Sequence, residues 1–94
     1  MTTEQPKLEI DFNSSKRWYL NDKLHREDGP AVERVNGDKC WYLNGKLHRE
    51  DGPACEFANG TKYWFLHDKD VTKNVEKLMK SGLSEIEVLS FLVL

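Results

Sequence analysis

Short runs of alternating polar and apolar residues, separated by turn residues, make up most of the chain before residue 71. The segments 39–43 and 62–66 are rich in aromatic and aliphatic residues, as half-buried strands are. Asn-Gly pairs stand at 36–37, 44–45 and 59–60, and Asn-Gly favours the type I′ turn of two-residue β-hairpins. The pattern therefore predicts an antiparallel meander of hairpins.

The chain repeats itself at an offset of 23 residues. Residues 18–39 and 41–62 match at 17 of 22 positions, and Trp18, Trp41 and Trp64 fall in one column. After Trp64 the third copy changes into a different sequence. A truncated last unit is typical of a capped repeat array.

The turns also predict which residues face each other across the strands. A two-residue turn at the second Asn-Gly pairs Trp41 with His48, and a two-residue turn at the first pairs Val32 with Trp41. Trp41 then shares a sheet face with Val32, while Tyr42 lies on the opposite face. Both faces carry an aromatic row, and we expect one row to pack on the terminal segments.

A block with the sequence His-Arg-Glu-Asp-Gly-Pro-Ala occupies 25–31 and again 48–54. Its Gly-Pro step ends a strand ladder and turns the chain. We interpret the block as a structural corner held by local charge pairs, because an active site is normally built once per domain. A small-ligand or hydrolytic site at these corners is an alternative. The repeated residues with a predicted structural role are Trp18, Trp41, Trp64, His25, His48, Asp28 and Asp51.

The two ends of the chain depart from the repeat. Leu8, Ile10 and Phe12 alternate with polar residues and predict an edge strand that covers the first sheet edge. From residue 71 onward the apolar spacing becomes helical, and Ser84 with Glu87 three residues later is a capping-box signature. We expect a helical hairpin that covers the end of the sheet.

These elements predict a mainly β (α+β) fold, an antiparallel β-hairpin repeat meander with a C-terminal helical cap. We expect a single domain over 1–94, since a chain of 94 residues has room for one hydrophobic core. It would consist of an N-terminal strand or arm (1–15), the hairpin repeats (16–71) and the helical hairpin (72–94).

Charge and composition narrow the function. The net charge is −2, with no basic or acidic tail, which argues against a general binder of polyanions. The longest uncharged run, 88–94, is far shorter than the roughly 20 apolar residues that span a bilayer, so we expect no membrane partner. Because charged residues are spread through the first 11 positions, we expect no secretory signal. We expect the protein in the cytoplasm.

Candidate chemistry is sparse. The three histidines and the cysteines Cys40 and Cys55 lack the spacing of zinc sites, so we predict no metal and no cofactor. The two Glu-Asp pairs adjoin Arg26 and Arg49, which favours neutralised turns over an acid–base pair. Cys55 stands where the first copy has Val32, which indicates a small buried residue rather than a nucleophile. We therefore predict that the protein is not an enzyme and has no catalytic residue.

At residues 41–48, Trp-Tyr-Leu-Asn-Gly-Lys-Leu-His, the chain resembles a MORN-type repeat, a 23-residue hairpin unit with an aromatic residue, Asn-Gly-Lys and then a histidine two positions on. The resemblance covers residues 17 to about 71. The usual His-Gly-x-Gly is replaced here by His-Arg-Glu-Asp-Gly-Pro at 48–53. This variant is similar to repeat proteins of bacteriophages, bacteria and giant viruses. The resemblance implies a repeat architecture and no single biochemical activity.

We expect a non-catalytic module that binds another protein, either a host factor or a second copy of itself through the C-terminal helix. The viral resemblance implies a phage accessory protein that inhibits or redirects a host factor, such as a defence factor, in the host cytoplasm. Residues that differ between the copies, or that lie outside them, are free to specialise. The predicted partner-binding residues are Arg34, Phe57, Ile86, Phe91 and Leu92.

Single-stranded nucleic acid is the alternative partner. Aromatic rows with neighbouring lysines and arginines are able to stack bases and contact phosphates. The acidic residues are interleaved with these basic ones, however, and the segment charges show no basic face. Nucleic acid is therefore disfavoured.

Overall fold

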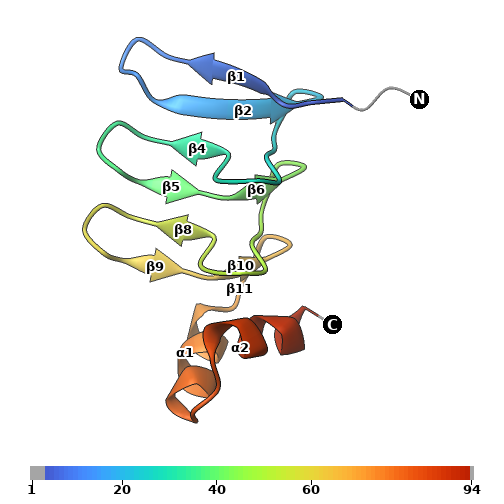
Figure 1. The fold of residues 1–94 in the computed structure, drawn as a ribbon, viewed down its shortest axis with the longest axis vertical. Coiled ribbons are helices and arrows are strands. Elements are labelled where there is room, and N and C mark those ends of the chain that lie inside the picture. Colours follow the sequence, from blue (N-terminus) through green and yellow to red (C-terminus); the bar gives the residue numbers. More distant parts are fainter. Residues whose placement is uncertain (1–3, 94) are drawn as a thin grey trace.

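The computed structural model describes residues 4–93 as a stack of β-hairpins followed by two helices (Figure 1). The predicted fold class, mainly β with a C-terminal helical hairpin, is confirmed. Residues 1–3 of the predicted arm and residue 94 of the predicted helical segment lie outside the described residues.

One antiparallel sheet runs the length of the stack, in the order β1-β2-β4-β5-β8-β9, with β3 paired to β2. Two short hairpins, β6 with β7 and β10 with β11, stand beside it. The strands of the sheet are β1 (Lys7–Ile10), β2 (Lys16–Leu20), β3 (Lys23–Leu24), β4 (Val32–Glu33), β5 (Lys39–Cys40), β8 (Cys55–Glu56) and β9 (Lys62–Tyr63). Those of the short hairpins are β6 (Tyr42–Leu43), β7 (Lys46–Leu47), β10 (Phe65–Leu66) and β11 (Lys69–Asp70).

The β6–β7 hairpin closes through the predicted two-residue turn. Asn44 and Gly45 both have positive φ (51° and 80°), as a type I′ turn requires. This turn pairs Tyr42 with Leu47, and the His48 N–H donates to the Trp41 carbonyl at 3.1 Å. The predicted pairing on this side of the stack is therefore confirmed.

The hairpins of the main sheet close through a different, five-residue loop, found at 11–15, 34–38 and 57–61. In each, the first residue's N–H donates to the fifth residue's carbonyl, and the fourth residue's N–H donates to the first residue's carbonyl. The fourth residue has positive φ, so the loop is a type I turn followed by a bulge. The repeat geometry therefore begins at β1, which the sequence pattern placed in a separate arm.

The five-residue loop changes the predicted register. Val32 pairs with Cys40, and the predicted pairing of Val32 with Trp41 is wrong. The Asn36-Gly37 pair closes a loop with one bulged residue, which shifts the returning strand by one position. Trp41 instead lies between β5 and β6, where its N–H donates to the Ala54 carbonyl at 2.7 Å.

The first strand also departs from its prediction in one respect. β1 pairs with β2 and covers the first edge of the repeats, as predicted. Phe12, expected to continue this strand, lies instead in the loop that follows it.

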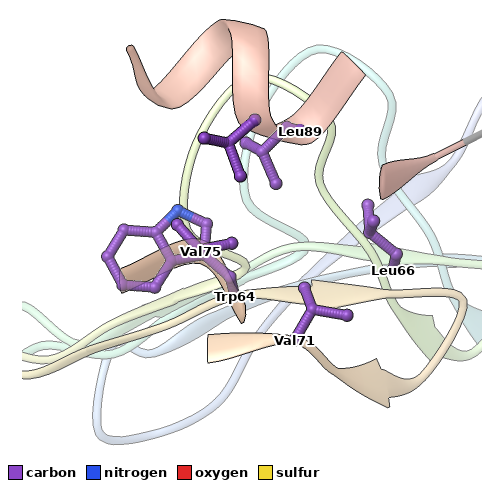
Figure 2. Close-up of a cluster of buried hydrophobic side chains, with 6 residues drawn as sticks. Trp64, Leu66, Val71, Val75 and Leu89 are labelled. Atoms are coloured by element: carbon purple, nitrogen blue, oxygen red, sulfur yellow. The ribbon is translucent and has the colours of Figure 1, made fainter. Parts of the chain in front are cut away.

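The largest apolar core lies where the helices meet the last repeat (Figure 2). Helix α1 (Thr72–Lys80) contributes Val75, and helix α2 (Glu85–Leu92) contributes Val88 and Leu89, all three fully buried. They pack with Trp64, Leu66 and Val71. Since burying an aliphatic side chain stabilises a fold by about 1.5–3 kcal/mol, this cluster holds the helices on the sheet.

Helix α2 begins with the predicted capping box. The Glu87 N–H donates to the Ser84 hydroxyl at 3.2 Å, and the Ser84 N–H donates to the Glu87 carboxylate at 3.0 Å. These contacts, the backbone N–H first, lower the pKa of the Glu87 carboxyl below its ordinary value. The cap therefore stabilises the fold more strongly while Glu87 is ionised.

Replacing Glu87 should change how stability depends on pH. Because the folded-state pKa of Glu87 is depressed, its contribution is complete above its ordinary pKa of 4.5 and is lost as the pH falls through the folded-state pKa. Gln is able to close a capping box without titrating. We expect Tm, followed by circular dichroism, to fall less between pH 6 and about pH 3 in Glu87→Gln than in the wild type.

Glu76→Gln is the matched control, since Glu76 is exposed on α1 and its side chain forms no hydrogen bond or ion pair among residues 4–93. It should reproduce the wild-type dependence on pH. Equal slopes in the wild type and Glu87→Gln would contradict the role of the cap.

Candidate functional site

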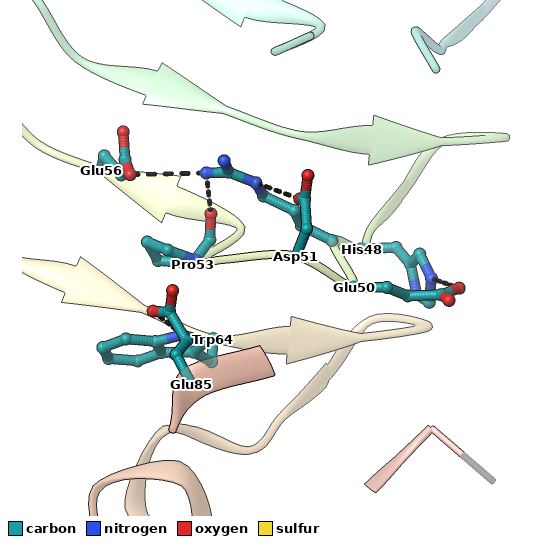
Figure 3. Close-up of polar contacts among 8 residues, drawn as sticks. His48, Glu50, Asp51, Pro53, Glu56, Trp64 and Glu85 are labelled. Carbon is teal, nitrogen blue, oxygen red and sulfur yellow. Dashed lines mark hydrogen bonds and ion pairs between the residues drawn. The ribbon is translucent and has the colours of Figure 1, made fainter. Parts of the chain in front are cut away.

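Each repeated corner is built around one arginine. The Arg49 guanidinium carbon lies 3.8 Å from the centroid of the Trp41 ring, a cation–π contact. Its Nε donates to Asp51 at 2.7 Å, and its Nη1 donates to the Pro53 carbonyl at 3.1 Å and contacts Glu56 at 3.4 Å (Figure 3). The arginine thus joins the Trp column, the Asp-Gly-Pro turn and strand β8 in one contact set.

The first corner has the same geometry. Arg26 lies 3.9 Å from the centroid of the Trp18 ring, and it donates to Asp28 at 3.0 Å and to the Pro30 carbonyl at 3.2 Å. A Cβ on Gly29 would meet the Arg26 guanidinium at 2.9 Å. The corner therefore favours glycine, because a Cβ there would displace the arginine that lies against the backbone. This geometry supports the interpretation of the block as a structural corner.

The two buried histidines join successive hairpins. His25 Nδ1 accepts the Asn44 N–H at 2.9 Å, and His48 Nδ1 accepts the His67 N–H at 2.8 Å. An accepting Nδ1 assigns the ring proton to Nε2, and His48 Nε2 accordingly donates to Glu50 at 2.7 Å. Both nitrogens of the His48 ring are engaged, so this ring is a structural link between hairpins.

The third tryptophan is covered by the helices. At the offset of 23, Thr72 stands in the column of the corner arginines. Its hydroxyl accepts the Trp64 backbone N–H at 2.9 Å, and the Trp64 indole N–H donates to Glu85 of α2 at 3.0 Å (Figure 3). The sequence pattern does not predict the Trp64–Glu85 contact. The replacement of arginine by Thr72 was the available signal that another residue would cover the third tryptophan.

A surface groove of about 740 Å³ lies between the two corners. Arg49 and Asp51 are paired with each other, and His48 has no open nitrogen. Across residues 4–93, no group of three or more His, Cys, Asp or Glu side chains is placed to hold a metal ion. The groove therefore has acidic side chains along it, but few of its polar groups lack a partner within the chain and remain free to bind or react with a ligand.

The two cysteines face each other across strands β5 and β8. Cys40 pairs with Cys55, and both are free thiols. Cys55 is buried in the same column as Val32, as predicted. A hydrogen bond between the thiols lowers the pKa of Cys40 and raises the pKa of Cys55, and burial raises the latter further. Cys55 therefore remains a neutral core thiol.

The predicted partner-binding residues fall on two separate surfaces. Arg34 and Phe57 occupy the same position in adjacent five-residue loops. Arg34 is exposed, whereas Phe57 is half-buried in an edge contact with Tyr63, with ring centroids 5.8 Å apart. These loops lie on one side of the stack, and α2 lies at its C-terminal end (Figure 1).

On α2 the predicted residues differ in exposure. Ile86 and Phe91 are 57% and 69% exposed, while Leu92 packs partly buried against the core. We call Ile86 and Phe91 the cap face. Leu92, which sequence reasoning grouped with them, belongs mainly to the core.

A third group was missed by sequence reasoning. The second residue of each five-residue loop is apolar: Phe12, Val35 and Ala58. Phe12 is 96% exposed and Val35 71% exposed, and the three loops lie one beside the next along the stack (Figure 1). We call these residues the loop-tip column. The spacing Asn-x-x-Lys-x-Trp, which starts at Asn13 and recurs 23 residues later, was the available signal.

Comparisons with known proteins identify no relative. A scan against protein-family models and searches of curated proteins and solved structures found no match. Within residues 4–93, neither helix is long and apolar enough to cross a bilayer. The function is therefore argued from the geometry of this chain.

Replacing a corner glycine should displace its arginine. A Cβ on Gly52 would lie 2.8 Å from the Arg49 guanidinium carbon, so Gly52→Ala should destabilise the fold by about 1–3 kcal/mol in urea denaturation. In an Arg49→Ala background the same change should cost much less, because the clash is gone. Equal costs in both backgrounds would contradict this account of the corner.

Removing the His48 acceptor should weaken the link between hairpins. His48→Leu leaves the His67 N–H without its partner, and we expect a loss of about 1–3 kcal/mol in urea denaturation. His67→Asn is the matched control. His67 has φ of 49°, and Asn44 occupies the equivalent position at 51°, so Asn should keep the backbone there and cost less than His48→Leu, losing only the contact between the His48 and His67 rings. Wild-type stability of His48→Leu would refute the link.

Proposed function

We propose that this chain is a non-catalytic protein-binding module of the MORN-like hairpin-repeat type. The observation that carries the proposal is the division between repeated and unrepeated side chains. The repeated Arg, Asp and His side chains of the corners are bonded within the chain, whereas large apolar side chains of the loop-tip column and the cap face point to solvent. Proteins recognise one another mainly through such apolar and aromatic anchors.

The composition of the loop side supports this proposal. The loop-tip column places Phe12 and Val35 beside the exposed Arg34. Aromatic residues and arginine are enriched among the residues that dominate binding energy at interfaces. A rigid loop also loses little conformational entropy on binding, and the Ala58 N–H, bonded to Asp38 at 2.8 Å, ties two of these loops together.

The corner geometry favours a protein partner over single-stranded nucleic acid. Base stacking needs an open aromatic face. Arg26 and Arg49 lie on the Trp18 and Trp41 rings, and Trp64 is buried beneath the helices. The same internal pairing of the corner charges weighs against a hydrolytic or ligand-sequestering site.

The resemblance to repeat proteins of phages and giant viruses extends the proposal to a biological role. A small module whose corner charges are paired internally suits an accessory protein that inhibits or redirects a host factor, such as a defence factor. Such a protein would act in the host cytoplasm.

Comparative affinity capture tests the proposal. The wild type and two double variants, Phe12→Ala with Val35→Ala and Ile86→Ala with Phe91→Ala, would be used on one host lysate with quantitative mass spectrometry. We expect a protein captured by the wild type to fall by roughly 30-fold with one of the double variants, since removal of a binding hot spot costs about 2 kcal/mol or more.

Lys73→Ala with Glu76→Ala, on the exposed side of α1, is the matched surface control and should capture as the wild type does. Circular dichroism verifies that every variant is folded. Identical capture by all variants would contradict the proposal. Salt-dependent binding of fluorescent oligonucleotides at two salt concentrations would instead favour the nucleic-acid alternative.

A further inference from the structure

Strand β1 forms an open edge of the main sheet. It is the outermost strand in the order β1-β2-β4-β5-β8-β9, and all four of its residues, Lys7–Ile10, are exposed. Nothing among residues 4–93 pairs with its far side (Figure 1). The opposite edge, β9, has only two residues. β1 is therefore the longer of the two edges able to pair with another strand.

The hydrogen-bond pattern identifies which backbone groups face outward. The Asp11 N–H donates to the Ser15 carbonyl at 3.1 Å, and bonded and non-bonded pairs alternate along an antiparallel ladder. Glu9 is therefore bonded to β2 through its pair with Arg17, whereas Leu8, opposite Trp18, is not. Consistently, the Trp18 N–H donates away from β1, to the Ala31 carbonyl at 2.9 Å. The N–H and C=O groups of Leu8 and Ile10 point to the open edge.

We propose that β1 pairs antiparallel with β1 of a second copy of this chain, centred on Leu8. In this register Leu8 opposes Leu8 of the second copy, and Lys7 opposes Glu9 of the second copy twice, once on each side of the symmetry axis. The strand is thus complementary to itself in charge. Among the ion pairs of residues 4–93, none uses Lys7 or Glu9, so both charges are available.

The same register satisfies the outward backbone groups. Each Leu8 N–H donates to the Leu8 carbonyl of the other copy, and each Ile10 N–H donates to the other copy's Pro6 carbonyl. Pro6 has no N–H, and in this position it is needed only as an acceptor. Four hydrogen bonds result, and the two sheets become one continuous sheet.

Neighbouring registers are disfavoured by charge. Centring the pair on Glu9 places Glu9 directly opposite Glu9 of the second copy, and centring it on Ile10 places Glu9 opposite Asp11. Like charges directly opposite across strands are destabilising. Of these three registers, only the one centred on Leu8 opposes unlike charges without opposing like ones.

This self-pairing leaves the cap face of the proposed function free. β1 lies at the opposite end of the stack from α2 (Figure 1), so the cap face remains uncovered in the dimer. The contact is much smaller than a standard interface. We therefore expect reversible association at protein concentrations of about 0.1–1 mM.

Charge-swapped variants of the full chain test both the pairing and its register. Sedimentation equilibrium should show a dimer for the wild type and association weakened by about tenfold or more for Lys7→Glu and for Glu9→Lys, each of which opposes like charges at two pairs. An equimolar mixture of the two variants should associate again. In that mixture, two acidic side chains at positions 7 and 9 of one chain would face two basic side chains at positions 9 and 7 of the other.

The double variant Lys7→Glu with Glu9→Lys should associate as the wild type does, because positions 7 and 9 still oppose unlike charges. In the register centred on Glu9 it should not associate, because two basic side chains would face each other at position 9. Circular dichroism on every variant separates lost pairing from lost folding. A wild type that stays monomeric at about 1 mM, the upper end of the expected range, would overturn the proposal. So would a dimer that survives Glu9→Lys but is lost in Phe91→Ala, which would place the interface on the cap face.

Discussion

The contact between a corner arginine and the tryptophan of its own repeat is the interaction from which the rest of the stack follows. The guanidinium needs a ring on one side, a carboxylate and a carbonyl at its edge, and a residue without a side chain against it. These needs explain why Trp41, Arg49, Asp51, Gly52 and Pro53 recur unchanged from the preceding repeat. A Lys in place of the arginine could not reproduce the planar, multiply bonded arrangement.

Stacking of one hairpin on the next depends on a second contact, made by the buried histidines. Each buried histidine accepts a backbone N–H of the following hairpin, 19 residues further along the chain. At the offset of 23 the third position in this column is Val71, which carries no acceptor, and the third arginine position is Thr72. The stack therefore ends where both contacts are lost, and the helices supply a replacement cover for Trp64 through Glu85 and the apolar core.

The features that depend on neighbouring residues were the predictable ones. The Asn44-Gly45 turn and the Ser84–Glu87 capping box each involve residues a few positions apart, and both are present as predicted. The predicted two-residue turn at Asn36-Gly37 is wrong, because Asn-Gly occurs both in two-residue turns and in bulged five-residue loops. The pairing of the strands on either side decides which of the two forms. The cover of Trp64 by Glu85 joins residues 21 apart after a change of secondary structure, which no local pattern encodes. The exposure of Ile86 and Phe91 likewise depends on which side of α2 meets the sheet.

The five-residue loops show how a repeat protein is able to vary an exposed surface without losing its fold. The backbone of each loop is held by its first, third, fourth and fifth residues. In the second loop, Arg34 and Asp38 close the hairpin, Asn36 accepts the Asp38 N–H, and Gly37 takes the positive φ. The second residue makes none of these bonds within its own loop, although the Ala58 N–H donates to Asp38 of the neighbouring loop, and its side chain is not needed for any of them. Phe12, Val35 and Ala58 at this position differ while the loops that carry them keep one geometry. The hydrogen bonds that close each loop are therefore made by positions other than the one whose side chain varies at its tip.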